Sequence, residues 1–168
     1  MGNDGVKRDR RADVPTVTAQ CTCGAVRLEM QVPAFWAWHD RSRATQRAHG
    51  AASATYVGTW RTRLRILDGA DDIARFEDPA AKSARSFCRH CGTPLIYERA
   101  SSTRMVNIPR ALFDLRTGRE PRYHIALDKA PEWAWRGERL GPLKGYPGVL
   151  WTGSVRRKRA APPWDLPP

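Results

Sequence analysis

The amino-acid sequence predicts a mainly β domain. Apolar and polar residues alternate with a period of two over residues 25–32, and several later short runs show similar strand-forming patterns. Gly, Pro and Asp residues, which favour turns, separate these runs. Residues 109–115 are predicted to form one or two helical turns, and little else in the sequence has a helical period.

The first predicted strand has one buried face, formed by Val26, Leu28, Met30 and Val32, and Pro33 ends it. Further strands are predicted, in chain order, over residues 61–66, 73–77, 83–87, 94–98, 104–108 and 123–127.

The second predicted strand carries three arginines on one face: Arg61, Arg63 and Arg65. We interpret this stripe as a solvated face that protects a sheet edge from pairing. The alternative is a path for phosphate or carboxylate groups.

The chain has 168 residues, which suffices for one domain. We expect a flexible leader over residues 1–15, a folded domain over 16–150 and a flexible, basic, Pro-rich tail over 151–168. No stretch approaches the roughly 20 apolar residues of a membrane span, and the start lacks the apolar core of a secretion signal. A cytoplasmic protein that does not enter membranes is therefore expected.

The formal net charge is +12. Such a surface attracts anions, including nucleic acid and acidic small molecules, through long-range and salt-sensitive forces. We favour a general solubilising role, because nucleic-acid-binding modules usually also carry a recognisable motif.

The four cysteines form two close pairs, Cys21-Thr-Cys23-Gly24 and Cys88-Arg-His-Cys91-Gly92. Zinc favours four tetrahedral thiolates, and each short pair supplies two of them from one tight turn. The glycine after each pair suits a turn that needs positive φ. The sequence therefore predicts one structural zinc per chain at Cys21, Cys23, Cys88 and Cys91.

Two other interpretations of the cysteines remain open. Disulfides are one, with three possible pairings, although a reducing cytosol disfavours them. A redox Cys-x-x-Cys motif is the other, although such a motif normally opens a helix and residues 92–97 resemble a turn followed by a strand.

Four motifs occur in a fixed order: Cys21-x-Cys23-Gly-Ala-Val-Arg27, Phe87-Cys88-x-x-Cys91-Gly-Thr-Pro-Leu95, Pro121-x-Tyr123-His124-Ile125 and Gly145-Tyr146-Pro147. From about residue 20 to residue 148, the chain resembles the glutathione-dependent formaldehyde-activating enzyme (GFA) family, which shares its domain with centromere protein V. The resemblance implies an Mss4-like, zinc-stapled β fold, with the structural zinc at the four cysteines. It also implies carbon–sulfur lyase chemistry on a glutathione–formaldehyde adduct.

The chain departs from this family at a second metal site. Family members have three further cysteines that hold a catalytic zinc, and the matching positions here are Trp36, Trp38 and Arg41. None of these side chains is a thiolate ligand, so the family's catalytic zinc is predicted to be absent. We interpret the two tryptophans as filling the vacated space; the alternative is an aromatic platform beside Arg41, Arg43 and Arg47 that stacks on a nucleobase or an anionic cofactor.

The histidines offer little support for a replacement metal site. His39, Asp40 and His49 are competent zinc ligands, but their spacing resembles no ligand pair, and we interpret the segment as a polar loop. His90 is expected to be a spectator within the second cysteine turn, and His124 a histidine packed in the core.

Three functions are consistent with the sequence. The first is a GFA-type lyase whose activity is altered or lost, with no catalytic residue that the sequence identifies. The second is a non-catalytic, zinc-stapled module that binds glutathione, another anionic small molecule or a protein. The third is a nucleic-acid-binding module, which the net charge and the family's chromosome-associated relative suggest.

Overall fold

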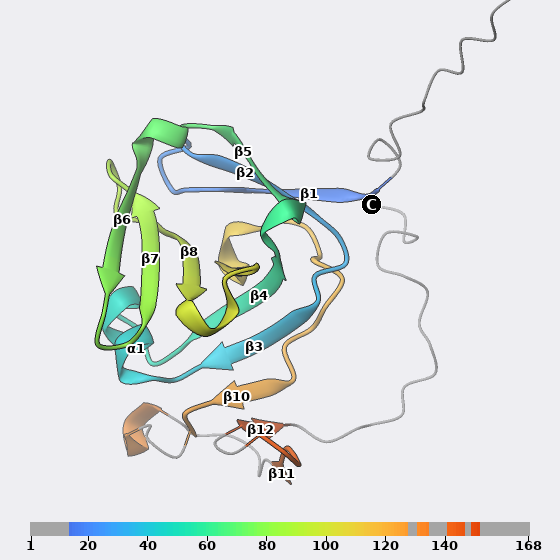
Figure 1. The fold of residues 1–168 in the computed structure, drawn as a ribbon, viewed down its shortest axis with the longest axis vertical. Helices are drawn as coiled ribbons and strands as arrows, with labels where there is room; N and C mark the ends of the chain where they lie inside the picture. Colours follow the sequence, from blue (N-terminus) through green and yellow to red (C-terminus); the bar gives the residue numbers. More distant parts are fainter. Residues whose placement is uncertain (1–13, 128–130, 135–140, 147–148, 152–168) are drawn as a thin grey trace, which may run out of the picture.

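The computed structural model describes residues 14–127, 131–134, 141–146 and 149–151. The predicted leader and tail lie almost wholly outside these ranges. Two β-sheets build the described part of the chain, so the mainly β fold class is confirmed. In Figure 1 the smaller sheet lies at the top, and the larger sheet curves beneath it.

The smaller sheet has the strand order β1-β2-β5, and neighbouring strands are antiparallel. Its strands are β1 (Thr16–Gln20), β2 (Arg27–Gln31) and β5 (Leu64–Asp68).

The larger sheet is antiparallel except where β10 runs parallel to β3. Its strands, in spatial order, are β11 (Gly141–Pro142), β12 (Val149–Trp151), β10 (Tyr123–Ile125), β3 (Trp36–Asp40), β4 (Ala54–Trp60), β9 (Met105–Pro109), β8 (Pro94–Arg99), β7 (Ser83–Cys88) and β6 (Ile73–Asp78).

The main hydrophobic core lies between the two sheets. Leu28 and Met30 from β2 pack there with Val57, Leu95 and Ile108 from the larger sheet, and all five are fully buried. Burial of each such side chain stabilises the fold by roughly 1.5–3 kcal/mol. The period-two pattern of β2 therefore has the predicted cause, a strand with one face on the core.

A second, aromatic core lies on the opposite face of the larger sheet. Side chains alternate between the two faces of a strand, so Ala37 joins the main core while its neighbour Trp38 points the other way. On β4, Val57 and Tyr56 are divided between the two cores in the same manner.

One α-helix, α1 (Arg43–His49), connects β3 to β4. Ser42 caps its start, because the Ser42 hydroxyl accepts a hydrogen bond from the Thr45 N–H. Gly50 ends it in the left-handed conformation, with φ of 59°. The described 3₁₀ helices cover Arg61–Arg63, Ala70–Asp72, Ala100–Ser102, Arg110–Leu112 and Glu132–Ala134. Within the described ranges, no helix combines the length and apolar character needed to span a membrane.

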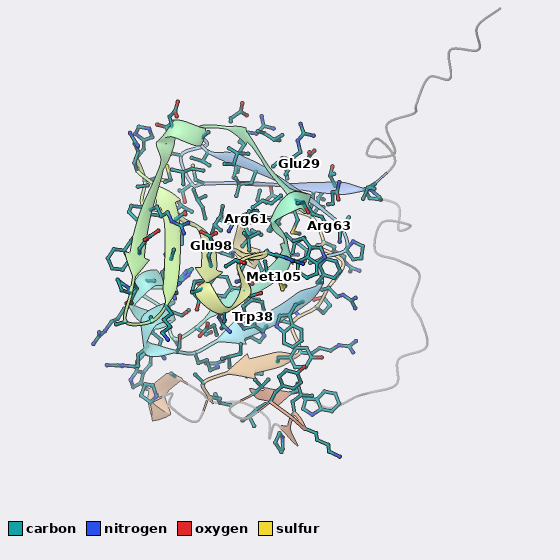
Figure 2. All side chains as sticks on the ribbon, viewed as in Figure 1. Glu29, Trp38, Arg61, Arg63, Glu98 and Met105 are labelled. Atoms are coloured by element: carbon teal, nitrogen blue, oxygen red, sulfur yellow. The ribbon has the colours of Figure 1, made fainter. Side chains whose placement is uncertain are left out.

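The prediction that the three arginines share one face of the second strand is wrong, because Arg61–Arg63 forms a 3₁₀ helix and the strand begins at Leu64. Arg61 is held away from the smaller sheet by two contacts. Its backbone N–H donates to the Arg104 carbonyl, and its guanidinium forms an ion pair with Glu98 (Figure 2).

The helical turn predicted within residues 109–115 is confirmed as the 3₁₀ turn Arg110–Leu112. One other boundary differs from the prediction. The strand expected over residues 123–127 ends at Ile125, because Ala126 has φ of 57° and leaves the extended conformation.

Candidate metal centre

Two tight turns bring the four cysteines together. Cys21 and Cys23 lie in the turn between β1 and β2, and Cys88 and Cys91 lie at the turn between β7 and β8. Each turn closes on itself: the Gly24 N–H donates to the Cys21 carbonyl, and the Gly92 N–H donates to the Cys88 carbonyl. Both glycines have the positive φ that the sequence predicts, 78° and 71°.

The four sulfur atoms converge on one point between the two sheets. Cys21 Sγ lies 3.5 Å from Cys23 Sγ, which lies 3.8 Å from Cys88 Sγ, and all four sulfurs lie within 4.8 Å of one another. Cys21 and Cys88 are buried, whereas Cys23 and Cys91 face solvent. All four are free thiols, so the structure contains none of the possible disulfides.

The second turn does not resemble a redox motif. A redox Cys-x-x-Cys normally opens a helix, whereas here β8 begins at Pro94, directly after the turn. The four thiols could instead hold a metal ion, and soft sulfur ligands select zinc, copper(I) or iron–sulfur clusters. With four protein ligands, such a site is closed to substrate.

Hydrogen bonds favour the thiolate forms of Cys91 and Cys21 but not that of Cys23. The Ala25 backbone lowers the pKa of Cys23, but hydrogen bonds with the Cys21 and Cys91 thiols outweigh this effect and raise it to about 12. Thr93 Oγ1 lies 3.1 Å from Cys91 Sγ, and the hydrogen bonds of the Thr93 side chain and backbone lower the pKa of Cys91 to about 5. Burial raises the pKa of the Cys21 thiol, but the Val26 N–H, 3.3 Å from its sulfur, and the neighbouring thiols outweigh this effect and lower it. Deprotonated sulfur is the form that binds metal.

Thr93 also joins the two turns directly. The Thr93 and Thr22 hydroxyl oxygens lie 2.9 Å apart, and the Thr93 hydroxyl accepts from the Thr22 N–H at 3.2 Å. These threonines support the site from outside the ligand set, a role that the sequence analysis missed. Their positions inside the two cysteine motifs were the available signal.

The family model for the glutathione-dependent formaldehyde-activating enzyme matches residues 16–129 of this chain, more than half of its length. The chain belongs to the GFA family. A crystal structure of a Rhodobacter sphaeroides protein is similar in fold, with a TM-score of 0.50 and 23% identity, over 62% of this chain and 91% of that chain. This likeness is consistent with the Mss4-like fold that the resemblance implied. None of the curated proteins compared with the chain matches it.

Bulky side chains pack at the three positions where the GFA resemblance places catalytic cysteines. Trp36 stacks on Tyr123, with ring centroids 4.5 Å apart and planes 7° apart. Trp38, on β3 in Figure 2, is 4% exposed and lies 5.6 Å from the Tyr56 ring. Arg41 is also buried, and its guanidinium donates to the Ala134 carbonyl.

The aromatic platform considered as an alternative is only partly accessible. Trp38 and Arg41 are buried, whereas the half-buried Trp36 lines a cavity together with Phe35 and Trp60. The exposed aromatics nearby are Phe35 and Trp60, whose ring centroids lie 5.2 Å apart, with the Arg63 guanidinium 5.1 Å from the Phe35 ring.

The prediction of a polar loop over residues 39–49 is wrong, because this segment forms the end of β3 and helix α1. His39 Nδ1 lies 2.8 Å from Thr55 Oγ1, and His49 Nε2 lies 2.7 Å from the Tyr56 hydroxyl. The buried Asp40 accepts from the Ser42 N–H at 2.8 Å. In the described part of the chain, the cysteines form the only group placed to hold a metal ion.

The other two histidines lie as the sequence indicated. His90 is exposed, with Nε2 2.8 Å from Asp72 Oδ1. His124 is buried against the His39 ring at 4.7 Å. Burial, with smaller effects from His39 and Arg41, lowers the pKa of His124 to about 4.

Proposed function

We propose that this chain is a zinc-stapled member of the GFA family that has lost the catalytic metal and binds an anionic small molecule without activating formaldehyde. A single observation carries the proposal. The three positions matched to the family's catalytic cysteines hold Trp36, Trp38 and Arg41. Trp38 and Arg41 are buried, and the half-buried Trp36 stacks on Tyr123.

The cysteine centre fits zinc in a structural role. A tetrahedral site with Zn–S bonds of about 2.3 Å places its sulfurs about 3.8 Å apart. The distances of 3.5 and 3.8 Å between neighbouring sulfurs are close to that value. Bound zinc would hold the two turns together through Cys21, Cys23, Cys88 and Cys91. Free thiols of this kind suit a reducing compartment such as the cytoplasm.

Formaldehyde activation needs more than this centre supplies. A glutathione thiolate attacks formaldehyde efficiently when an open metal position holds and orients the sulfur. A four-sulfur site has no such position, and the described residues place no second metal-ligand group elsewhere. The net charge of +12 supports an anionic ligand, which the protein would bind without transforming it.

Two measurements on the same preparation test this function. Elemental analysis of protein purified without added zinc is expected to give one zinc per chain. An exchange assay with glutathione and formaldehyde is expected to give the same rate with and without the protein. Two metal ions per chain, or an acceleration that chelator abolishes, would restore the lyase function and refute the proposal.

The triple variant Trp36→Cys, Trp38→Cys and Arg41→Cys provides the matched comparison. If these positions correspond to the family's ligands, the variant is expected to bind a second zinc. A variant that folds and still binds one zinc contradicts the assignment of these positions.

A further inference from the structure

A cavity of about 250 Å³ lies between helix α1 and the strands β7 and β8. No cysteine lines it, but Gly92 of the second cysteine turn does. Ala48 of α1 and Tyr56 of β4 line one part of it. Arg85 of β7 and Tyr97 of β8 line another, and the two are cross-strand neighbours in the sheet.

Arg85 is the one charged side chain on the wall of this cavity within the described residues. It is half-buried, and neutral groups hold it in place. Its Nη1 donates to the Tyr56 hydroxyl at 2.9 Å, its Nη2 donates to Thr45 Oγ1 at 3.0 Å, and its guanidinium carbon lies 4.4 Å from the Tyr97 ring centroid.

These contacts leave the charge of Arg85 without a counter-ion. No carboxylate in the described part of the chain lies within ion-pair distance of it. The nearby Asp40 carboxylate accepts from the Ser42 N–H instead. A guanidinium has five N–H donors. Two of those of Arg85 have acceptors in the described part of the chain, which leaves three that could bind a ligand.

A second hydrogen bond fixes the Tyr56 hydroxyl that positions Arg85. His49 Nε2 lies 2.7 Å from this hydroxyl. Burial and the positive charge of Arg85 lower the pKa of His49, and a neutral ring can accept a hydrogen bond from the Tyr56 hydroxyl. Tyr56 can then accept from Arg85, and the guanidinium is held before any ligand arrives.

The rest of the cavity wall is mainly apolar, with side chains from Phe76, Phe87, Pro94, Ile96 and Pro109. Ligand cavities commonly combine such walls with a few polar groups that fix the ligand's orientation. A carboxylate matches the planar fork of an arginine with two parallel hydrogen bonds. The volume is below the roughly 300–1,000 Å³ of pockets for drug-sized ligands, which indicates a small one.

We propose that this cavity binds a small monocarboxylate with a flat apolar body, whose carboxylate pairs with Arg85 and whose body lies against Tyr97 and the apolar wall. The inference rests on the proposed binding function and names its ligand class. Inorganic phosphate shares the negative charge and lacks the apolar body, so the two can be separated experimentally.

The test is a titration of the full, zinc-loaded chain with benzoate, followed by calorimetry and by amide chemical shifts. Benzoate is expected to bind at one site and to shift amides of β7, β8 and α1. Neutral benzamide and inorganic phosphate are each expected to bind about tenfold or more weakly, since each lacks one part of the recognition.

Arg85→Gln is expected to weaken benzoate binding about tenfold or more, because it removes a charge-assisted, bidentate partner. Arg99→Gln is the matched control: Arg99 lies 5.5 Å from the same Tyr97 ring but does not line this cavity. Its affinity is expected to stay within about twofold of the original, since this arginine does not reach the ligand. If Arg85→Gln fails to fold, Arg85→Lys is used, which keeps the charge, loses the planar fork and is expected to bind about threefold or more weakly.

Three results would overturn the inference: no saturable benzoate binding, equal binding of benzamide, or benzoate binding that neither Arg85 variant weakens. Phosphate binding as tight as that of benzoate would overturn the assignment of an apolar ligand. Each of these results leaves the zinc content and the exchange assay unaffected, so failure of this inference is distinguishable from failure of the proposed function.

Discussion

Cys88→Ser tests the cysteine centre most directly. Cys88 is fully buried and is the cysteine that β7 contributes to the point where the two sheets meet. A serine hydroxyl stays protonated at neutral pH and does not replace a thiolate. The variant is therefore expected to bind zinc more weakly and to unfold at lower temperature, because metal binding and folding are coupled in such sites.

The size of the effect follows from the number of ligands. Structural zinc contributes about 10–16 kcal/mol in small zinc-binding peptides, so one of four equal ligands accounts for roughly 2.5–4 kcal/mol. The total stability of a domain is about 5–15 kcal/mol. At about 2–4 °C per kcal/mol for a chain of this size, Tm is expected to fall by roughly 5–16 °C.

Zinc content and calorimetric Tm, each measured with and without chelator, provide the assay. His90→Ala is the control, since His90 lies in the same turn but its ring is exposed and contacts Asp72. The control is expected to keep one zinc per chain. The reasoning fails if Cys88→Ser retains a full zinc equivalent, resists chelator as the original does and melts within about 2 °C of it.

Three further predictions concern stability. Glu98→Gln is expected to lower the unfolding free energy by about 1–3 kcal/mol. The loss is smaller than for a fully buried pair, because the two arginines that pair with Glu98 are about half exposed. The control Glu77→Gln, at an exposed glutamate, should change the unfolding free energy by less than about 0.5 kcal/mol, and equal effects of the two variants in urea titrations would contradict the prediction. Gly69→Ala is expected to lower the unfolding free energy by more than about 2 kcal/mol, because Gly69 has φ of 71° and an added Cβ would lie 2.1 Å from a backbone oxygen. Gly50→Ala is expected to cost about 1 kcal/mol, because nothing lies within 4 Å of the Cβ added there. A smaller loss at residue 69 would show that the turn relaxes. The pKa of His124 is lowered to about 4, below the ordinary value of about 6.5. The unfolded protein therefore binds a proton at this histidine more readily, and the unfolding free energy falls by about 3 kcal/mol between pH 6.5 and pH 4. The prediction is refuted if the difference in unfolding free energy between the original protein and His124→Asn is the same at every pH.

The fold could be predicted where one face of a strand meets the core and the other meets solvent. Leu28 and Met30 follow that rule, and their strand was predicted. On β3, Ala37 and Trp38 are both buried because both faces of the sheet are covered there, and the alternation that reveals a strand disappears. Helix α1 is short, and its buried residues are the polar Thr45 and Gln46, so no apolar stripe marks it.

The candidate sites differ in the same respect. The cysteine centre could be predicted because two local spacings each supply two ligands, and distance along the chain between them is immaterial. The environment of Arg85 could not, because Thr45, Tyr56 and Tyr97 reach it from three other elements. No local sequence pattern predicts that Arg85 would lack a carboxylate partner.

The meeting of two hairpin turns from different sheets at one cluster of four cysteines also orders events during synthesis. Cys23 and Cys88 are 65 residues apart, so the growing chain carries an unpaired cysteine turn while strands β2 to β7 are made. The two turns can meet only after Cys91 has emerged, and contacts across so long a separation form slowly. Until then a nascent chain exposes two thiols to any metal in its surroundings. If the cluster binds zinc as proposed, zinc supply at that moment is expected to influence how many chains fold.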